Sequence, residues 1–270
     1  WIFLIFAFVI QSAVLAQDSL TIVSYNVENL FDCEHDTLKN DSSFLPHGLH
    51  HWNYHHYQTK LNRIAQVIVN ISGWESAALV GLCEVENKRC LRDLCYRLRR
   101  FHYQYVHYES DDERGIDVAL LYDSTKVKIL NSKTLCVPLE NDVTRDILYV
   151  KALIEGKDTL HVMVCHLPSQ LGGSATTSKK RQIAKQVIQN EINTILHVQP
   201  KANVVVMGDM NSEAKDDLQG MNNLMIDLEK EGIGTHKYQG MWSCLDQFYV
   251  SSALKNTTRA SVFSPEWLLE

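Results

Sequence analysis

The chain has 270 residues, of which 45% are hydrophobic and 21% are charged, a composition typical of a folded globular protein. Its formal net charge of -6 excludes a global positive field for holding polyanions, so a nucleic-acid substrate would need a local basic patch or a bridging metal ion. No Pro/Gly/Ser-rich linker, repeat or low-complexity tract divides the sequence, which favours one large domain over two small ones.

The sequence opens with an unbroken apolar run, Trp1–Ile10, followed by the short side chains of Val14 and Ala16. This pattern is similar to the end of a secretory signal peptide that is cleaved after Ala16. The run is shorter than the roughly 20 residues of a membrane-spanning helix, although a membrane anchor is the alternative. We therefore expect residues 1–16 to be a partial signal peptide, residues 17–270 to form a mature chain without a membrane span, and the protein to be secreted or periplasmic.

Short apolar runs predict β-strands, because they are rich in Val, Ile and Leu and are bounded by polar or turn residues. In chain order they are Thr21–Val27, Ala77–Cys83, Ile116–Tyr122, Thr159–Cys165, Asn203–Met207 and Leu245–Ser251. Apolar residues at helical spacing predict amphipathic helices around residues 61–71, 91–98 and 183–195. Strands that alternate with helices in this way predict an α/β layered sandwich.

The cysteines fit an exported protein only loosely, because their number, 7, is odd and no CxxC occurs. Cys83, Cys165 and Cys244 each lie in an apolar, strand-like run. We expect buried free thiols that pack as small hydrophobic groups, rather than a disulfide framework or a metal site.

Several predicted strands end at a residue that can bind metal or phosphate. Asn26 lies near the end of the first strand, and Glu84, His166 and Asp209 directly follow apolar runs. The rim of a buried sheet holds a side chain rigidly while leaving it within reach of substrate, and α/β enzymes place their sites there. Any one of these residues is often only the first solvated position after a strand, but the set predicts a functional site.

The ordered motifs resemble those of the endonuclease/exonuclease/phosphatase superfamily, the group that includes DNase I. The matching segments cover nearly all of the predicted mature chain and are Ser24–Phe31, Gly81–Asn87, Arg114–Tyr122, Val164–Ser169, Gly208–Ser212 with its GDxN tetrad, and Leu245–Ser251. The resemblance implies a DNase I-like sandwich of two mixed β-sheets flanked by helices. It also implies a divalent-metal-dependent hydrolase of phosphoester bonds.

The resemblance assigns Glu84 as the metal ligand, with Mg²⁺ or Mn²⁺ as the cofactor. Magnesium binds hard oxygen ligands through one or two carboxylates, and a divalent cation neutralises a phosphodiester that would otherwise repel nucleophiles. Asn26 matches the asparagine beside the metal and would donate to a phosphate oxygen, with a plain turn residue as the alternative. Arg114 is a further phosphate-binding candidate, as are Lys180 and Arg181, and a solvated position is equally open for each.

Two further pairs carry the expected chemistry. In extended geometry Asp209 and Asn211 point to the same side. Asp209 would then orient or deprotonate the attacking water, and Asn211 would donate to the charge on phosphorus. A capped Gly-Asp turn is the alternative.

Asp246 lies inside an apolar run, where an unpaired carboxylate is costly. We therefore expect it to hydrogen-bond to His166 and raise the pKa of that imidazole. The imidazolium would protonate the leaving group or stabilise the transition state, unless the pair is purely structural.

A group of histidines precedes the first predicted helix. It comprises His47, His50, His51, His55 and His56. The group has no compact ligand spacing and no cysteine partner, so we expect an irregular loop, with a transition-metal or substrate contact as the alternative.

The superfamily's last strand carries Ser-Asp-His, a tripeptide that occurs nowhere in this sequence. Leu245–Gln247 matches the preceding strand instead. We therefore expect residues 17–270 to be a domain that lacks its C-terminal strand, and the activity of such a fragment stays open.

The leading interpretation is a phosphodiesterase or endonuclease whose partner is a phosphoester, nucleic acid included, and which needs no stable protein partner. A phosphomonoesterase or a phospholipid headgroup phosphodiesterase is the alternative within the fold, because a fold does not choose a substrate. A non-catalytic exported binding protein is the alternative from another class. The absence of Ser-Asp-His favours that binding protein, whereas Glu84, His166, Asp209 and Asn211 favour an enzyme.

Overall fold

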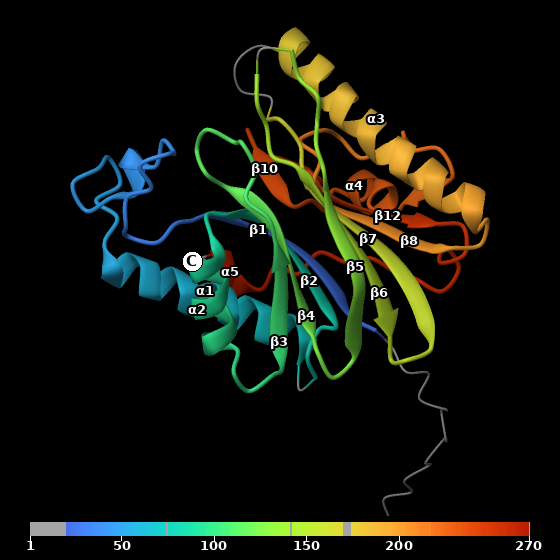
Figure 1. Ribbon diagram of the computed structural model, residues 1–270, viewed down its shortest axis with the longest axis horizontal. Coiled ribbons are helices and arrows are strands. Elements are labelled where there is room, and N and C mark those ends of the chain that lie inside the picture. The colour runs from blue at the N-terminus through green and yellow to red at the C-terminus, as the bar shows by residue number, and fades with distance from the viewer. Residues whose placement is uncertain (1–19, 74, 141, 170–173, 216, 270) are drawn as a thin grey trace, which may run out of the picture.

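The computed structural model describes residues 20–269 except 74, 141, 170–173 and 216. Two large β-sheets pack face to face, and helices cover the outer face of each sheet (Figure 1). This arrangement confirms the predicted α/β sandwich of two mixed sheets flanked by helices. The predicted signal peptide, residues 1–16, lies outside the described residues.

The first sheet has the order β1-β2-β4-β3. β1 (Ile22–Leu30) runs parallel to β2 (Leu79–Val85), whereas β4 (Asp117–Asp123) is antiparallel to both β2 and β3 (Tyr103–His107). A parallel pair needs a long crossover connection, which contains α1 (Tyr54–Ser72). β1 and β2 therefore end at the same edge of the sheet.

The second sheet has the order β5-β6-β7-β8-β12-β9. β7 and β8 are parallel, and the chain crosses between them through α3 (Ser174–Val198), while β12 is antiparallel to β8. The ends of β7 and β8 and the start of β12 therefore meet at one edge. The strands are β5 (Val127–Leu135), β6 (Ile147–Ile154), β7 (Asp158–His166), β8 (Asn203–Asp209), β9 (Met221–Asn223) and β12 (Asp246–Ser251).

The remaining elements are short, apart from α2. They are η1 (Ser42–Phe44), α2 (Lys88–Arg97), α4 (Ile226–Lys230), the hairpin of β10 (His236–Tyr238) and β11 (Met241–Ser243), and α5 (Glu266–Leu269). Within the part of the chain that the structure describes, no helix is long and apolar enough to cross a membrane.

Apolar side chains fill the space on both faces of each sheet. In β2, Val80 and Leu82 pack towards α1 and α2, while Leu79 and Cys83 pack against the second sheet. A strand that is buried on both faces reads as a continuous apolar run, which explains why β2 was predictable from sequence. A third core lies between α3 and the second sheet.

The cysteines follow the sequence-based expectation. Cys83, Cys165 and Cys244 are buried free thiols. Each sulfur therefore packs as a small hydrophobic group within the cores rather than forming a cross-link.

Candidate functional site

Predicted site residues from both sheets meet where β2, β7 and β8 end. The amide nitrogen of Asn26 donates to Glu84 Oε1 at 3.2 Å and to Asp209 Oδ2 at 3.2 Å. His166 Nε2 lies 3.8 Å from Glu84 Oε1 and 3.7 Å from Asp209 Oδ2. The structure therefore joins Asn26 and Glu84 of the first sheet to His166 and Asp209 of the second.

A β-bulge presents Glu84 to this group. The pairing of β2 shifts between Cys83 and Val85, and Glu84 has a φ of 66°. Left-handed backbone costs an L-residue about 1–2 kcal/mol, and such strain is concentrated at functional sites. The bulge takes Glu84 out of the ladder and turns its carboxylate towards Asn26 and His166.

The GDxN segment forms a tight turn at the end of β8. Gly208 has a φ of 132°, and a Cβ added there would overlap the carbonyl oxygen of Cys165 on β7, so only glycine fits. Beyond it, Asp209 Oδ1 accepts the backbone N–H of Asn211 at 2.8 Å. The Asn211 side-chain amide donates to the carbonyl oxygen of Leu167 at 2.9 Å. The turn thus fixes the carboxylate of Asp209 from within its own loop.

The expected hydrogen bond between His166 and Asp246 is wrong. Asp209 is the register partner of His166 on one side and of Asp246 on the other. Since neighbouring strands lie about 4.8 Å apart, β8 keeps the backbones of His166 and Asp246 two strand spacings apart, and no hydrogen bond or ion pair joins their side chains. Asp246 Oδ1 is enclosed and has no hydrogen-bond partner.

The expected protonation of His166 is also wrong. Burial lowers the pKa of His166 well below its usual value, and the charges of Arg145 and Arg114 lower it further. The imidazole is therefore neutral at pH 7 in this arrangement, and its Nδ1 is buried without a hydrogen-bond partner.

Burial disfavours ionisation of two of the carboxylates gathered here. Burial, followed by the charge of Asp209 and more weakly that of Glu84, raises the pKa of Asp246 to about 7. Burial also raises the pKa of Asp209, although hydrogen bonds from Asn211 and Asn26 act in the opposite direction. Hard oxygen donors with an orphaned Oδ1 among them fit a divalent cation such as Mg²⁺ or Mn²⁺.

Arg145, which was not singled out in the sequence, is a buried part of this site. It donates from Nη1 to Asp112 Oδ2 at 2.9 Å and from Nε to the carbonyl oxygen of His166 at 3.1 Å. It therefore fixes the end of β7. The sequence signal for it is weak, because Arg145 precedes an apolar strand instead of following one.

Arg114, the phosphate-binding candidate from sequence, lies at the surface beside this group. Its side chain is 53% exposed, and its Nε lies 3.8 Å from Asp112 Oδ1. Its positive charge still lowers the pKa of His166. An exposed guanidinium at the rim is able to meet an anionic substrate, so this role stays a prediction.

The hairpin of β10 and β11 also borders the site, which the sequence did not suggest. Thr235 Oγ1 accepts the backbone N–H of Asp246 at 3.0 Å. The charge of the adjacent His236 acts to lower the pKa of Asp209. Exposed Tyr238 and Trp242 lie on the same hairpin.

The histidines near the start of α1 form no hydrogen bond or ion pair with the described residues of this site. Within the described ranges they form no group of three close ligand atoms. His50 packs on Phe44 with ring centroids 4.7 Å apart, and His56 packs near Trp52 at 5.9 Å. His55 and His56 lie in the first turn of α1, and the side chain of Asn53 accepts hydrogen bonds from both of their backbone N–H groups. The predicted loop therefore ends at Asn53, earlier than expected.

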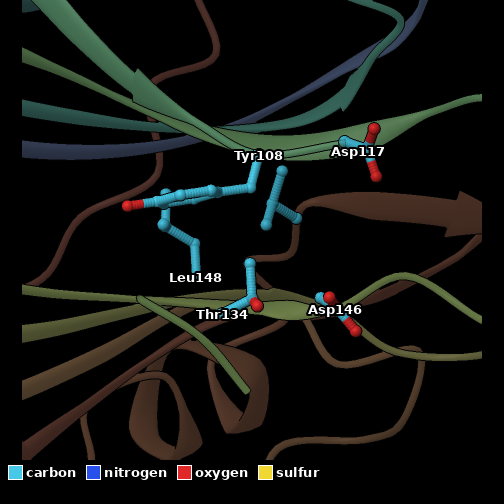
Figure 2. Close-up of a pocket in the computed structure, with 6 residues that line it drawn as sticks. Tyr108, Asp117, Thr134, Asp146 and Leu148 are labelled. Carbon is cyan, nitrogen blue, oxygen red and sulfur yellow. The ribbon is translucent and has the colours of Figure 1, made fainter. Parts of the chain in front are cut away.

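A small cavity between the sheets is distinct from the candidate site. Tyr108 and Asp117 border it from the first sheet, and Thr134, Asp146 and Leu148 from the second (Figure 2). Its volume of about 10 Å³ has room for about one water molecule. It does not have room for a substrate.

The chain is similar in fold to several solved structures. TDP2 from C. elegans aligns at 14% identity with a TM-score of 0.61, covering 86% of this chain and 64% of that one. D. rerio TDP2 complexed with a single-strand DNA product aligns at 21% identity (TM-score 0.56; 89% and 86% covered). The mannosyl-6-phosphatase of Bacteroides thetaiotaomicron aligns at 15% identity (TM-score 0.58; 87% and 86%).

The chain thus spans less than two thirds of the C. elegans protein. A search of curated protein sequences finds no significant match. The family model for the Endonuclease/Exonuclease/phosphatase family matches residues 21–268. Its match covers nearly the whole described chain and includes every strand that borders the site, so the chain belongs to the Endonuclease/Exonuclease/phosphatase family.

Proposed function

We propose that this protein is a phosphodiesterase, endonuclease activity included, that uses Mg²⁺ or Mn²⁺ held at Glu84. The observation that carries the proposal is the convergence of Glu84, Asp209 and Asp246 from two sheets, without a Lys or Arg ion pair to any of them among the described residues. Gathering carboxylates in this way is costly unless a cation binds them. A bound divalent cation neutralises the phosphate and polarises its P–O bond.

Asp209 is the residue best placed to act as the general base. Its Oδ1 accepts from the Asn211 backbone and its Oδ2 from Asn26, so the carboxylate is held in one orientation. Burial raises the pKa of Asp209, and a carboxylate whose pKa lies closer to neutrality accepts a proton from water more readily.

The other residues orient these carboxylates and the phosphate. Asn26 directs its amide nitrogen at both Glu84 and Asp209, which makes it a positioning residue as well as a candidate phosphate donor. A neutral His166 is able to donate one hydrogen bond to a phosphate oxygen without first being protonated. Arg114 at the rim would attract the anionic substrate.

Phosphomonoesters are the second candidate substrates. The similarity of the mannosyl-6-phosphatase, which extends over 87% of this chain and 86% of that one, supports them. The D. rerio TDP2 structure, which contains a single-strand DNA product and matches at comparable coverage, supports the diester. Both are fold-level analogies, so the substrate has to be measured.

Hydrolysis of bis-p-nitrophenyl phosphate and p-nitrophenyl phosphate, each with Mg²⁺ and with EDTA, tests the proposal. We expect Mg²⁺-dependent turnover that favours the diester and is lost in Glu84→Gln. Single-stranded DNA and a phospholipid panel then identify the natural class. Turnover that survives EDTA, or binding of these compounds without any turnover, would overturn the proposal in favour of another mechanism or of a binding protein.

We also propose that the protein is exported, on the basis of the sequence of residues 1–16 alone. Fractionation of cells that express the intact gene tests this. Recovery of the protein only from the cytoplasm would contradict it.

A further inference from the structure

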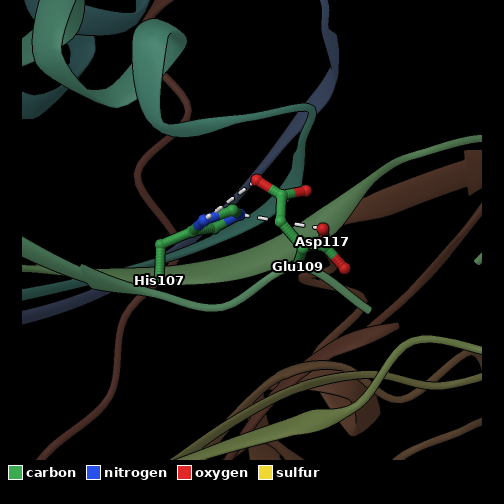
Figure 3. Close-up of side chains that lie close together, drawn as sticks. All are labelled: His107, Glu109 and Asp117. Atoms are coloured by element: carbon green, nitrogen blue, oxygen red, sulfur yellow. Dashed lines mark ion pairs between the residues drawn. The ribbon is translucent and has the colours of Figure 1, made fainter. Parts of the chain in front are cut away.

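A second group of potential ligands lies on the first sheet, outside the proposed phosphoesterase site. His107 ends β3, and Asp117 begins the antiparallel β4, with His107 opposite Ala119. Extending that register places Glu109 opposite Asp117, and side chains two residues apart in a strand share a face. The three side chains accordingly point towards one another (Figure 3).

Two of these groups, His107 and Asp117, are buried and poorly satisfied by the protein. His107 Nε2 lies 3.7 Å from Asp117 Oδ2, and His107 Nδ1 lies 3.8 Å from Glu109 Oε1, which is beyond hydrogen-bond range. The His107 side chain is 0% exposed, and both of its ring nitrogens and Asp117 Oδ2 lack a hydrogen-bond partner. Leaving a buried polar atom unpaired costs about 1–3 kcal/mol, and a bound cation would offset that cost.

The spacing of the donor atoms suits a metal ion. One atom from each of His107, Glu109 and Asp117 lies within 4.8 Å of the other two, whereas ligands bonded at about 2.0–2.2 Å to one zinc ion stand roughly 3–4 Å apart. The Glu109 side chain is 51% exposed, so it is free to move the remaining distance.

Neighbouring groups prepare two of the ligands. Ser110 donates to Asp117 Oδ1 from both its backbone N–H and its hydroxyl, which orients the carboxylate and leaves Oδ2 facing His107. Burial, assisted by the charge of Lys88, lowers the pKa of His107 to about 4. The imidazole is therefore in the neutral form that binds metals.

We propose that His107, Glu109 and Asp117 form a second divalent-metal site, separate from the one at Glu84. One imidazole with two carboxylates favours a transition metal such as Zn²⁺ over Mg²⁺. The ion would join the ends of the β3–β4 loop. That loop carries Asp112, the partner of buried Arg145, so metal binding would stabilise the loop beside the phosphoesterase site.

Zinc binding by the full chain, measured by calorimetry and by metal analysis after dialysis, tests the proposal. The Glu84→Gln background removes the other predicted metal ligand. In that background we expect one Zn²⁺ per chain, which millimolar Mg²⁺ does not displace. Glu109→Gln should weaken zinc binding at least about tenfold, the lower end of the usual effect of perturbing a metal site. Glu113→Gln, an exposed carboxylate in the same loop, should leave it unchanged.

Co²⁺ substitution provides a second readout. Bound through His107, it should give visible absorption bands that His107→Gln removes, and melting curves show whether that variant still folds. Glu109 is half-exposed, so its variant tests the site even if His107→Gln does not fold. No zinc in the Glu84→Gln protein, or zinc that Glu109→Gln and Glu113→Gln retain equally, would place the ion elsewhere and overturn the proposal.

Discussion

Asp246 and Asp209 are register partners on the neighbouring antiparallel strands β12 and β8, so two carboxylate residues lie side by side where β8 ends and β12 begins. Burial and the charge of Asp209 raise the pKa of Asp246 to about 7. This pairing disfavours the folded protein whenever both groups are ionised. It therefore makes the stability of the protein depend on pH and on bound cations.

The first prediction is that Asp246→Asn stabilises the protein at high pH in EDTA. A raised pKa means that the folded state holds the proton more tightly than the unfolded chain, so stability is present below about pH 4 and is lost as the pH rises to about 7. The variant should gain up to about 4 kcal/mol at pH 8, since each pKa unit is worth about 1.4 kcal/mol, and almost nothing at pH 4. Thermal unfolding at both pH values measures this, and an equal gain at pH 4 would contradict it.

The second prediction is that Glu84→Gln removes Mg²⁺ or Mn²⁺ binding and lowers turnover by more than about 100-fold, because it removes a direct ligand rather than a supporting one. The reason is that Glu84 is the carboxylate that the bulge of β2 turns towards His166. Glu28→Gln, an exposed carboxylate of β1, is the matched control. Calorimetry that finds the same affinity in both variants would remove Glu84 from the site.

The third prediction compares the stability cost of a steric overlap with the cost of a left-handed backbone alone. Gly208→Ala should destabilise the protein by about 3 kcal/mol or more, because the new Cβ overlaps the backbone of β7 and packed strands cannot move apart cheaply. Gly156→Ala shares a left-handed φ but has nothing within 4 Å, so it should cost only about 1–2 kcal/mol. Urea unfolding compares the two, and equal losses would show that φ alone matters.

The fourth prediction concerns the two arginines near the site. Arg145→Gln should cost about 3–5 kcal/mol, because it leaves the buried Oδ2 of Asp112 without its cationic partner. Arg114→Gln should leave stability within about 0.5 kcal/mol, as for most exposed positions. It should instead raise KM for an anionic substrate. A large loss of stability in Arg114→Gln would show that Arg114 is structural.

The strands that could be predicted from sequence are those in which an apolar run is bounded by polar or turn residues, and most of them are buried on both faces. β2 and β8 were recognisable because Val, Leu and Met fill most of their positions, and Glu84 and Asp209 come at the ends of these apolar runs. β5 was missed because it is largely exposed and mixes Lys, Asn and Ser with its apolar residues. Its side chains satisfy no single periodicity.

The sequence indicated candidate site residues but not which side chains would lie beside them. Glu84 and Asp209 follow recognisable motifs, but the neighbour of His166 depends on strand order, which no local pattern encodes. β8 lies between β7 and β12, and that order alone separates His166 from Asp246. Arg145 was missed for a similar reason, because its partners lie 33 residues earlier and 21 residues later in the chain.

Gly81 on β2 meets Met207 and Val164 of the second sheet so closely that an added Cβ would lie 2.7 Å from the Met207 terminal methyl carbon and 3.3 Å from a Val164 methyl carbon. Glu84 and Asp209 follow Gly81 and Met207 in the same two strands. The thickness of the core at this point consequently affects the separation of the Glu84 and Asp209 carboxylates. A larger side chain at position 81 would push the two sheets apart, so a residue in the core would alter the geometry of the proposed metal site.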